Sequence, residues 1–178
     1  MATVDNTTVT ITPSPTANLM NHTNSYSTNL LQGETYQISS YYDGADDTIT
    51  NDVTGTRITS DKPVAVFAGA SLANVPAEKY ACANPLVQEQ MPVDSWGTQA
   101  LAMGFAGRMN GDSYRVLTAT NNTVVSTNGV AAGTIQAGHF LDLLIEGPVQ
   151  FQGSQPIQVA HFANGTDFDG LRPLKKAV

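Results

Sequence analysis

The chain has 178 residues, enough to bury roughly 70% of its unfolded surface and to form one domain or two small ones. Because 41% of the residues are hydrophobic and only 13% are charged, the composition excludes a disordered tail and a coiled coil. A net charge of −7 with only eight Lys and Arg residues argues against a nucleic-acid partner. The longest apolar run, 64–70, is far shorter than the ~20 residues of a membrane-spanning helix.

The beginning of the chain lacks the features of a signal peptide. The first basic residue is Arg57, so no positively charged segment precedes an apolar one. Two interpretations stay open: a mature fragment of a secreted protein, or a protein used without secretion, as a phage structural protein is. Cys82 is the single cysteine, which excludes a disulfide within this chain.

The first third of the chain alternates short strands with polar loops. Thr3–Ile11 is rich in β-branched residues and is predicted as a strand. Residues 18–29 are predicted as a loop or a weak edge strand. The pattern over Glu34–Ser39 predicts a strand with Tyr36 and Ile38 on one face. Asp43–Asp52 is acidic and contains glycine, which is typical of a loop.

The middle of the chain combines a buried strand with an irregular stretch. After a short strand at 56–59, Val64–Ala68 is apolar on both faces, so a position inside a sheet is expected. Pro85 limits any helix in the next segment, and Val75–Trp96 is therefore predicted as an irregular crossover. Trp96 is expected to pack in the core between the two flanking parts.

The last third predicts strands joined by glycine turns. Asn110-Gly111 and Asn128-Gly129 are typical hairpin turns. No amphipathic helical stretch of ten or more residues is present. The expected fold class is therefore all-β, an antiparallel, sandwich-like arrangement. The predicted strands are 100–105, 114–118, 123–126, 140–145, 150–151 and 156–162.

Three segments of the first half are echoed in the second half, in the same order. They are 5–9 with 121–125, 30–36 with 135–141, and 60–66 with 153–159. The echoes predict an internal duplication that yields two related β-lobes. The expected organisation is a first β-lobe at 1–74, a crossover at 75–97 and a second β-lobe at 98–178. Together these parts can also count as one compact domain.

The sequence contains no recognisable catalytic motif, and neither catalytic nor cofactor-binding residues are assigned. His22, His139 and His161 lie far apart, without metal-ligand or catalytic spacing. His161 falls in a strand of buried type, where a hydrogen-bonded packing role is expected. Glu89 and Asp94 are the acids available to a glycosidase, but nothing distinguishes them from other acids.

Two acidic loops contain oxygen ligands suited to Ca²⁺. One holds Asp43, Asp46 and Asp47, and the other holds Asp167 and Asp169. Ca²⁺ takes six to eight oxygens, and the second loop lacks the first acidic ligand and the distal glutamate of a calcium loop. Solvated turns are therefore the expected role of both loops, and no metal site is assigned.

Several segments in order along the chain resemble the N-terminal domain of the IgGFc-binding protein family. The family often has two cysteines around the Asn-Val-Pro segment, but Leu72 stands at the first of these positions. The resemblance thus implies no disulfide here, only the solitary Cys82. The matching segments are Gly55–Phe67, Ala73–Pro76, Leu86–Pro92, Ser95–Gly97, Gly111–Leu117 and the strand at Asn121.

The resemblance implies a non-catalytic, β-rich adhesion or binding module, extracellular or displayed on a surface. Fc binding is attributed to animal members, and no catalytic residue carries over. The expected partner is a protein or glycan surface, with no nucleic acid, no membrane span and no cofactor. One alternative is a self-assembling subunit of a phage virion or extracellular filament, whose partners are its own copies. The other is a carbohydrate-active β-sandwich enzyme.

Overall fold

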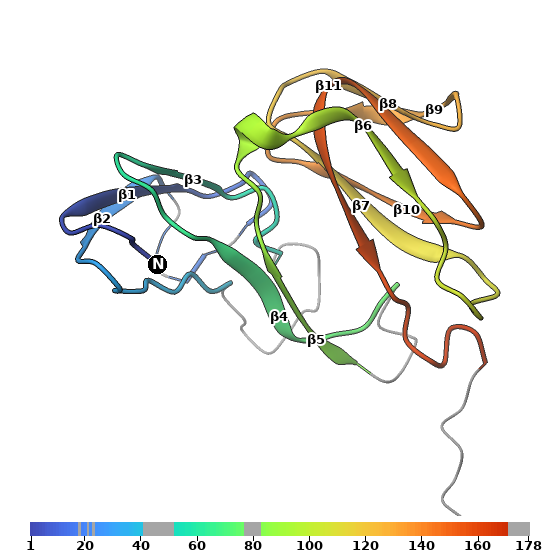
Figure 1. Ribbon diagram of the computed structural model, residues 1–178, viewed down its shortest axis with the longest axis horizontal. Helices are drawn as coiled ribbons and strands as arrows, with labels where there is room; N and C mark the ends of the chain where they lie inside the picture. Colours follow the sequence, from blue (N-terminus) through green and yellow to red (C-terminus); the bar gives the residue numbers. More distant parts are fainter. Residues whose placement is uncertain (18, 21, 23, 41–51, 77–82, 171–178) are drawn as a thin grey trace, which may run out of the picture.

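The computed structural model in Figure 1 describes residues 1–17, 19–20, 22, 24–40, 52–76 and 83–170. Its regular elements are antiparallel strands and one short 3-10 helix, which confirms the predicted all-β class. The strands form a three-stranded sheet, a two-stranded hairpin and a six-stranded sheet. Within the described part of the chain, no helix is long and apolar enough to cross a membrane.

The three-stranded N-terminal sheet consists of β1 (Thr7–Thr12), β2 (Tyr26–Leu30) and β3 (Arg57–Ser60) in the order β2-β1-β3. Residues 18–29, predicted as a loop or a weak edge strand, thus end in the edge strand β2. Alternate side chains of β1 face inward, because successive residues of a strand point to opposite faces. The core beneath the sheet contains Ala2, Val9, Ile11, Leu19 and Leu30.

The six-stranded C-terminal sheet is organised around its last strand. β11 is 14 residues long, and a register shift between Gln152 and Ile157 divides it into two halves. The first half pairs with β6 and β8, and the second half pairs with β7, so the sheet curls on itself. The strands are β6 (Gly97–Ala102), β7 (Asp112–Thr118), β8 (Thr123–Thr127), β9 (Val130–Ile135), β10 (Phe140–Ile145) and β11 (Val149–Phe162).

One of the two predicted hairpin turns is confirmed. Asn128 and Gly129 both have positive φ angles, of 49° and 79°, and they join the paired strands β8 and β9. Asn110-Gly111 precedes β7, but β6 pairs with β11 instead of β7, so the prediction of a hairpin there is wrong. The core of this sheet contains Tyr114, Val116, Val125, Ile135, Val149, Phe151 and Ile157.

A hairpin stands where the sequence predicts an irregular crossover. β4 (Phe67–Ala73) pairs with β5 (Asn84–Glu89), and the 3-10 helix η2 (Val93–Ser95) follows. Pro85 does not prevent the strand, because it lies near its start, where a missing N–H is tolerated. The predicted crossover over Val75–Trp96 is therefore wrong over β5.

The expectation of burial fails for this hairpin. Phe67 is 60% exposed and nearly every residue of β4 is exposed, whereas Val64, at the start of the same apolar run, packs against the N-terminal core. Trp96 is half-buried, its indole N–H donates to the Met91 carbonyl at 3.1 Å, and it belongs to neither core cluster. Glu34–Ser39 makes no strand ladder, contrary to the prediction.

The N-terminal part meets the C-terminal sheet through close backbone contact. Gly55 and Gly138 both have positive φ angles, and their backbones touch. A Cβ atom at Gly55 would overlap the carbonyl oxygen of Gly138. Pro15 and Ser14 lie against Gly138 from the same side. Glycine is therefore required at position 55 for both its φ angle and its size.

Several local contacts recur at the echoed positions. Thr7 donates to the Val4 carbonyl at 2.6 Å, and Thr123 donates to the Thr120 carbonyl at 2.8 Å. Both threonines are fully buried and follow an asparagine in the left-handed region. Two backbone-to-side-chain hydrogen bonds also recur: the N–H of Gln32 donates to Asp5 as the N–H of Ala137 donates to Asn121, and the N–H of Thr8 donates to Asp61 as the N–H of Val124 donates to Ser154. The strand register matches as well, since Thr7 lies opposite Leu30 and Thr123 lies opposite Ile135.

These pairs make the N-terminal order β2-β1-β3 correspond to β9-β8-β11 in the C-terminal sheet. Strand β1 corresponds to β8, and both are central in their three-stranded units. The correspondence supports the duplication inferred from the echoed segments, which stays a proposal. The division of the chain at 74 and 97 likewise stays a proposal.

Replacing Gly55 by alanine is expected to lower the free energy of unfolding by at least about 2 kcal/mol more than replacing Gly129. Both residues have positive φ, so each variant carries a backbone cost of about 1–2 kcal/mol, but only Gly55 faces a backbone atom. Urea unfolding of G55A and G129A measures the difference. Equal losses would show that the two backbones are not in contact.

Candidate functional site

The structure gives Asp169 a role within the protein. Its side chain is buried and lies 2.5 Å from Nε of Arg108, and the N–H groups of Met109 and Asn110 donate to it at 3.4 and 3.3 Å. These contacts fix the loop after β11 to the loop before β7. Asp167 is half-buried nearby. Asp43, Asp46 and Asp47 lie outside the described residues.

No cluster of three His, Cys, Asp or Glu side chains occurs among the residues that the structure describes. Asp167 and Asp169, which carry oxygen ligands suited to Ca²⁺, are therefore not joined by a third acidic or imidazole ligand within that part. Arg108 also donates to the Asn164 and Gly165 carbonyls at 2.6 and 3.3 Å. The positive charge beside Asp169 disfavours a cation there.

His161 is held between two aromatic rings. Phe105 stacks on it at 4.2 Å between ring centroids, and Tyr114 stacks at 4.4 Å. Its Nε2 lies 3.2 Å from Oδ2 of Asp112, a fully buried carboxylate that also accepts the N–H of Phe105 at 2.7 Å. Burial and the charge of Asp112 raise the pKa of Tyr114. This arrangement matches the packing role expected for His161.

Arg115 connects the two parts of the molecule. Its Nη1 forms an ion pair with Asp52 and donates to the Thr54 hydroxyl at 2.9 Å. Its Nε and Nη2 donate to the two oxygens of Asp142 at 2.7 and 2.8 Å, and its guanidinium lies 3.8 Å from the centre of the Phe140 ring. Burial by itself would raise the pKa of Asp52. Hydrogen bonds from Thr54 and the charge of Arg115 outweigh burial and lower it.

An aromatic pocket of about 200 Å³ opens in the N-terminal part. Tyr26 lines it and stacks on His22 at 3.6 Å, while Tyr36 lies edge-on to Tyr26 at 6.3 Å. Leu19 and Ile38 supply apolar walls. Burial raises the pKa of Tyr26 to about 12, with contributions from the hydrogen bond to Tyr36 and from the electrostatic interaction with Tyr36. The hydroxyl of Tyr26 therefore stays protonated at physiological pH.

A second pocket, of about 280 Å³, lies against the C-terminal sheet and is more open than the first. It is lined by Leu101, Met103, Pro148 and Val149 among others. Leu101 and Met103 are largely exposed. Neither pocket contains Glu89 or Asp94, the acids available to a glycosidase.

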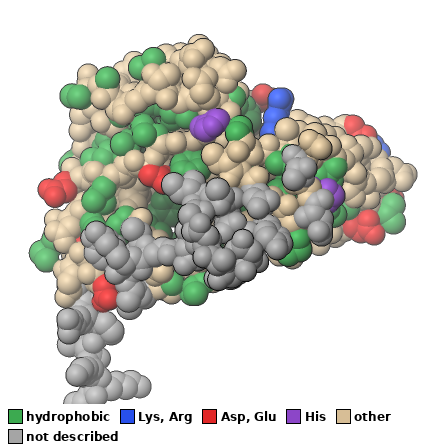
Figure 2. Space-filling view, turned by 180° about the vertical axis from the view of Figure 1, so that it is seen from behind, with side chains coloured by type: hydrophobic (Ala, Val, Ile, Leu, Met, Phe, Trp, Pro, Cys, Tyr) green, Lys and Arg blue, Asp and Glu red, His purple; other side chains and the backbone are tan. Residues whose placement is uncertain are grey.

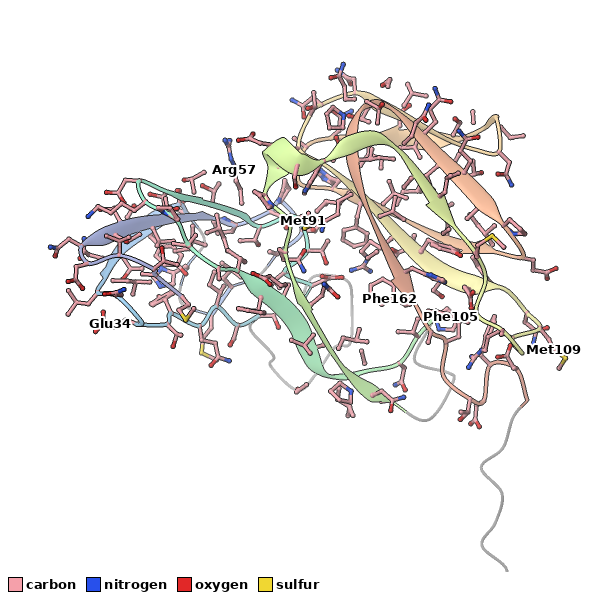
Figure 3. All side chains as sticks on the ribbon, viewed as in Figure 1. Glu34, Arg57, Met91, Phe105, Met109 and Phe162 are labelled. Atoms are coloured by element: carbon pink, nitrogen blue, oxygen red, sulfur yellow. The ribbon has the colours of Figure 1, made fainter. Side chains whose placement is uncertain are left out.

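The hairpin of β4 and β5 exposes several large apolar side chains. Phe67, Leu72 and Val87 are 60%, 70% and 77% exposed, although large apolar side chains normally avoid water. Figure 2 shows sparse Lys and Arg on the face it presents, and Figure 3 places Met91 near the hairpin between the two sheets. Sequence reasoning missed the exposure of β4, because an apolar run without polar alternation predicts burial.

Comparisons with known proteins agree with the family resemblance. The sequence model of the IgGFc binding protein family matches residues 1–175. The chain is 26% identical over 118 residues to the human IgGFc-binding protein, an alignment that covers 64% of this chain and 2% of the human protein. The chain thus spans a very small part of that relative. No solved structure matches it.

Replacing Asp52 by asparagine is expected to lower the free energy of unfolding at pH 7 by about 1–2 kcal/mol, because Arg115 loses a partly buried charged partner. The lowered pKa means that the stabilisation is present above pH ~4 and is lost as the pH falls through the folded-state pKa. Urea unfolding from pH 7 to pH 2.5 measures the gap between D52N and the wild type.

The matched control is Asp142→Asn, which removes the other carboxylate of Arg115. The side chain of Asp142 is 56% exposed, against 27% for Asp52, so a smaller loss, below about 1 kcal/mol, is expected. A gap for D52N that does not narrow in acid would contradict the assigned ion pair.

Proposed function

The chain belongs to the IgGFc-binding protein family, and on that premise we propose that it is a non-catalytic module that binds a protein partner outside the cell. The observation that carries the proposal is the uncovered apolar hairpin, with Phe67, Leu72 and Val87 largely in water. Apolar patches on stable proteins mark interaction sites, because their exposure is unfavourable until a partner covers them. A two-stranded hairpin is marginally stable alone, which strengthens the argument.

Membership of the family supports a location outside the cell for this module. The human relative is named for binding the Fc region of immunoglobulin G. An immunoglobulin Fc region is met outside the cell, and a module of that family is expected there too. Of the 13 residues in β4 and β5, Glu89 alone is charged, so contacts at the hairpin would be apolar and through the backbone. A glycan surface is the other expected partner class.

Self-assembly is the second candidate, in a virion or an extracellular filament. It is favoured by the seven residues of β4, which contain no charge and no proline. Natural edge strands usually carry charged residues or proline, which prevent pairing between copies. A carbohydrate-active enzyme has less support, because Glu89 and Asp94 are both exposed and line neither pocket.

Binding of the purified chain to immobilised human Fc fragment and to immobilised purified mucin tests the proposal. Val87→Glu is expected to weaken binding at least tenfold, because a charge would enter the apolar contact. Val130→Glu is the control, since Val130 is 69% exposed on β9. Biolayer interferometry measures both variants, and circular dichroism checks their folding.

Light scattering over a concentration series separates recognition from self-assembly. A monomer at every concentration is expected for a recognition module. If the wild type forms an oligomer and the V87E variant is a monomer, partner recognition is not the main role and self-assembly is favoured. Equal effects of V87E and V130E on partner binding would contradict the role of the hairpin.

A further inference from the structure

Three asparagines of the chain are directly followed by glycine, at Asn110-Gly111, Asn128-Gly129 and Asn164-Gly165. Asparagine is a thermolabile residue, because the nitrogen of the next residue can attack its side-chain carbonyl carbon. Glycine has no Cβ atom, so it hinders this attack least. The reaction also requires the asparagine side chain to turn onto that nitrogen. All three dipeptides lie among the described residues, and the contacts around them differ.

Asn164-Gly165 is protected by burial and by hydrogen bonds at each reacting group. The Nδ2 of Asn164 donates to the Gly111 carbonyl at 2.8 Å, and its Oδ1 accepts the Ser113 hydroxyl at 2.6 Å. The N–H of Gly165, whose nitrogen would have to attack, donates to the Val75 carbonyl at 2.8 Å. Asn164 is buried, so its side chain cannot turn without leaving buried polar groups unpaired.

Asn128-Gly129 is exposed, but both ends of its side-chain amide are held by the chain at the start of β11. The Oδ1 of Asn128 accepts the N–H of Gln150 at 2.8 Å, and its Nδ2 donates to the Pro148 carbonyl at 3.3 Å. The backbone N–H of Asn128 also donates to the Gln150 carbonyl at 2.9 Å. Both side-chain bonds must break before Cγ can approach the glycine nitrogen.

Asn110-Gly111 differs from both, because only one end of its side-chain amide is held. Asn110 is exposed, and its Nδ2 donates to the Phe168 carbonyl at 3.1 Å. Within the described part of the chain, neither Oδ1 of Asn110 nor the N–H of Gly111 has a hydrogen-bond partner. Figure 3 places Met109, the preceding residue, at the outer end of the loop between β6 and β7. One hydrogen bond in contact with water therefore holds this side chain.

The fold requires the glycine that makes Asn110 vulnerable. Gly111 has a φ angle of 82°, which L side chains rarely adopt. A Cβ atom at this position would also lie 2.9 Å from the Ile145 carbonyl oxygen, at the end of β10. A bulkier residue that shields the nitrogen at position 111 is therefore excluded by the packing against β10.

We propose that Asn110 is a site of spontaneous deamidation in the folded protein, whereas Asn128 and Asn164 are protected. The nitrogen of Gly111 forms a bond to Cγ of Asn110, the Cγ–Nδ2 bond breaks, and ammonia leaves with the proton of the glycine N–H. Water then opens the cyclic imide at either of its two carbonyl carbons. One product has aspartate at position 110, and the other has isoaspartate, whose main chain runs through Cγ. Water is the co-reactant, and nothing is oxidised or reduced.

The new carboxylate would lie beside Asp169. The backbone N–H of Asn110 donates to Oδ1 of Asp169 at 3.3 Å, and the other oxygen of Asp169 is paired with Arg108. A second negative charge repels Asp169, and a carboxylate cannot donate to the Phe168 carbonyl as the amide does. Deamidation is therefore expected to weaken the attachment of the loop after β11 to the loop before β7. This effect does not depend on what the module binds.

Peptide mapping by mass spectrometry over a time course measures all three sites in one sample. The full chain is incubated at mildly alkaline pH, once folded and once in guanidinium chloride. In the folded protein, deamidation is expected to be at least about tenfold faster at Asn110 than at Asn128 or Asn164, because the protected side chains must first break two hydrogen bonds. In guanidinium chloride the difference is expected to fall below about threefold, since unfolding removes these bonds. Peptides with aspartate and with isoaspartate are both expected at position 110.

Asn110→Asp tests the effect of the new charge, because it reproduces the aspartate product at nearly the same size. The N–H of Met109 donates to Asp169 at 3.4 Å. Its hydrogen exchange, measured by NMR, is expected to be at least about threefold faster in N110D than in the wild type. Asn128→Asp is the matched control, since its carboxylate can still accept the N–H of Gln150 and lies in another loop. No change at Met109 is expected in N128D.

Two results of the time course would overturn the proposal. One is deamidation at Asn128 or Asn164 that is as fast as at Asn110 in the folded protein. The other is a preference for Asn110 that persists unchanged in guanidinium chloride, because local sequence and not the fold would then set it. Equal exchange of Met109 in N110D and in the wild type would overturn the expected effect on the loop.

Discussion

The ion pair between Arg115 and Asp52 fixes how the two parts of the molecule sit against each other. Arg115 extends from β7, in the middle of the C-terminal sheet, and contacts a loop that leads into β3. Asp142 and Phe140, both on the neighbouring strand β10, also hold the guanidinium, so contacts within the C-terminal sheet help to fix its direction toward Asp52. The touching backbones of Gly55 and Gly138 complete the junction, and they leave no room for a side chain.

Much of the family pattern in this chain maintains the fold. Asp112 accepts a backbone N–H and contacts His161, Ser113 donates to Asn164 at 2.6 Å, and Tyr114 fills the core. Arg115 makes the junction. The binding surface that we propose lies elsewhere, on the hairpin of β4 and β5.

How much of the fold the sequence predicts depends on whether neighbours in the chain are also neighbours in space. Asn128-Gly129 joins two paired strands, so its turn and register follow from local chemistry. Asn110-Gly111 has the same chemistry, yet β6 pairs with a strand some fifty residues away. The contacts of Thr7 and Thr123 recur in the two echoed segments, because both depend on residues within three positions.

Composition and alternation by themselves determined an all-β protein and many of its strands, and the family followed from segments that resemble it in order along the chain. They also predicted a strand over residues 34–39, which is wrong because this segment pairs with no strand among the described residues. Only the tertiary structure decided that Phe67 and Val87 are exposed, since burial depends on what covers a strand and not on its own residues.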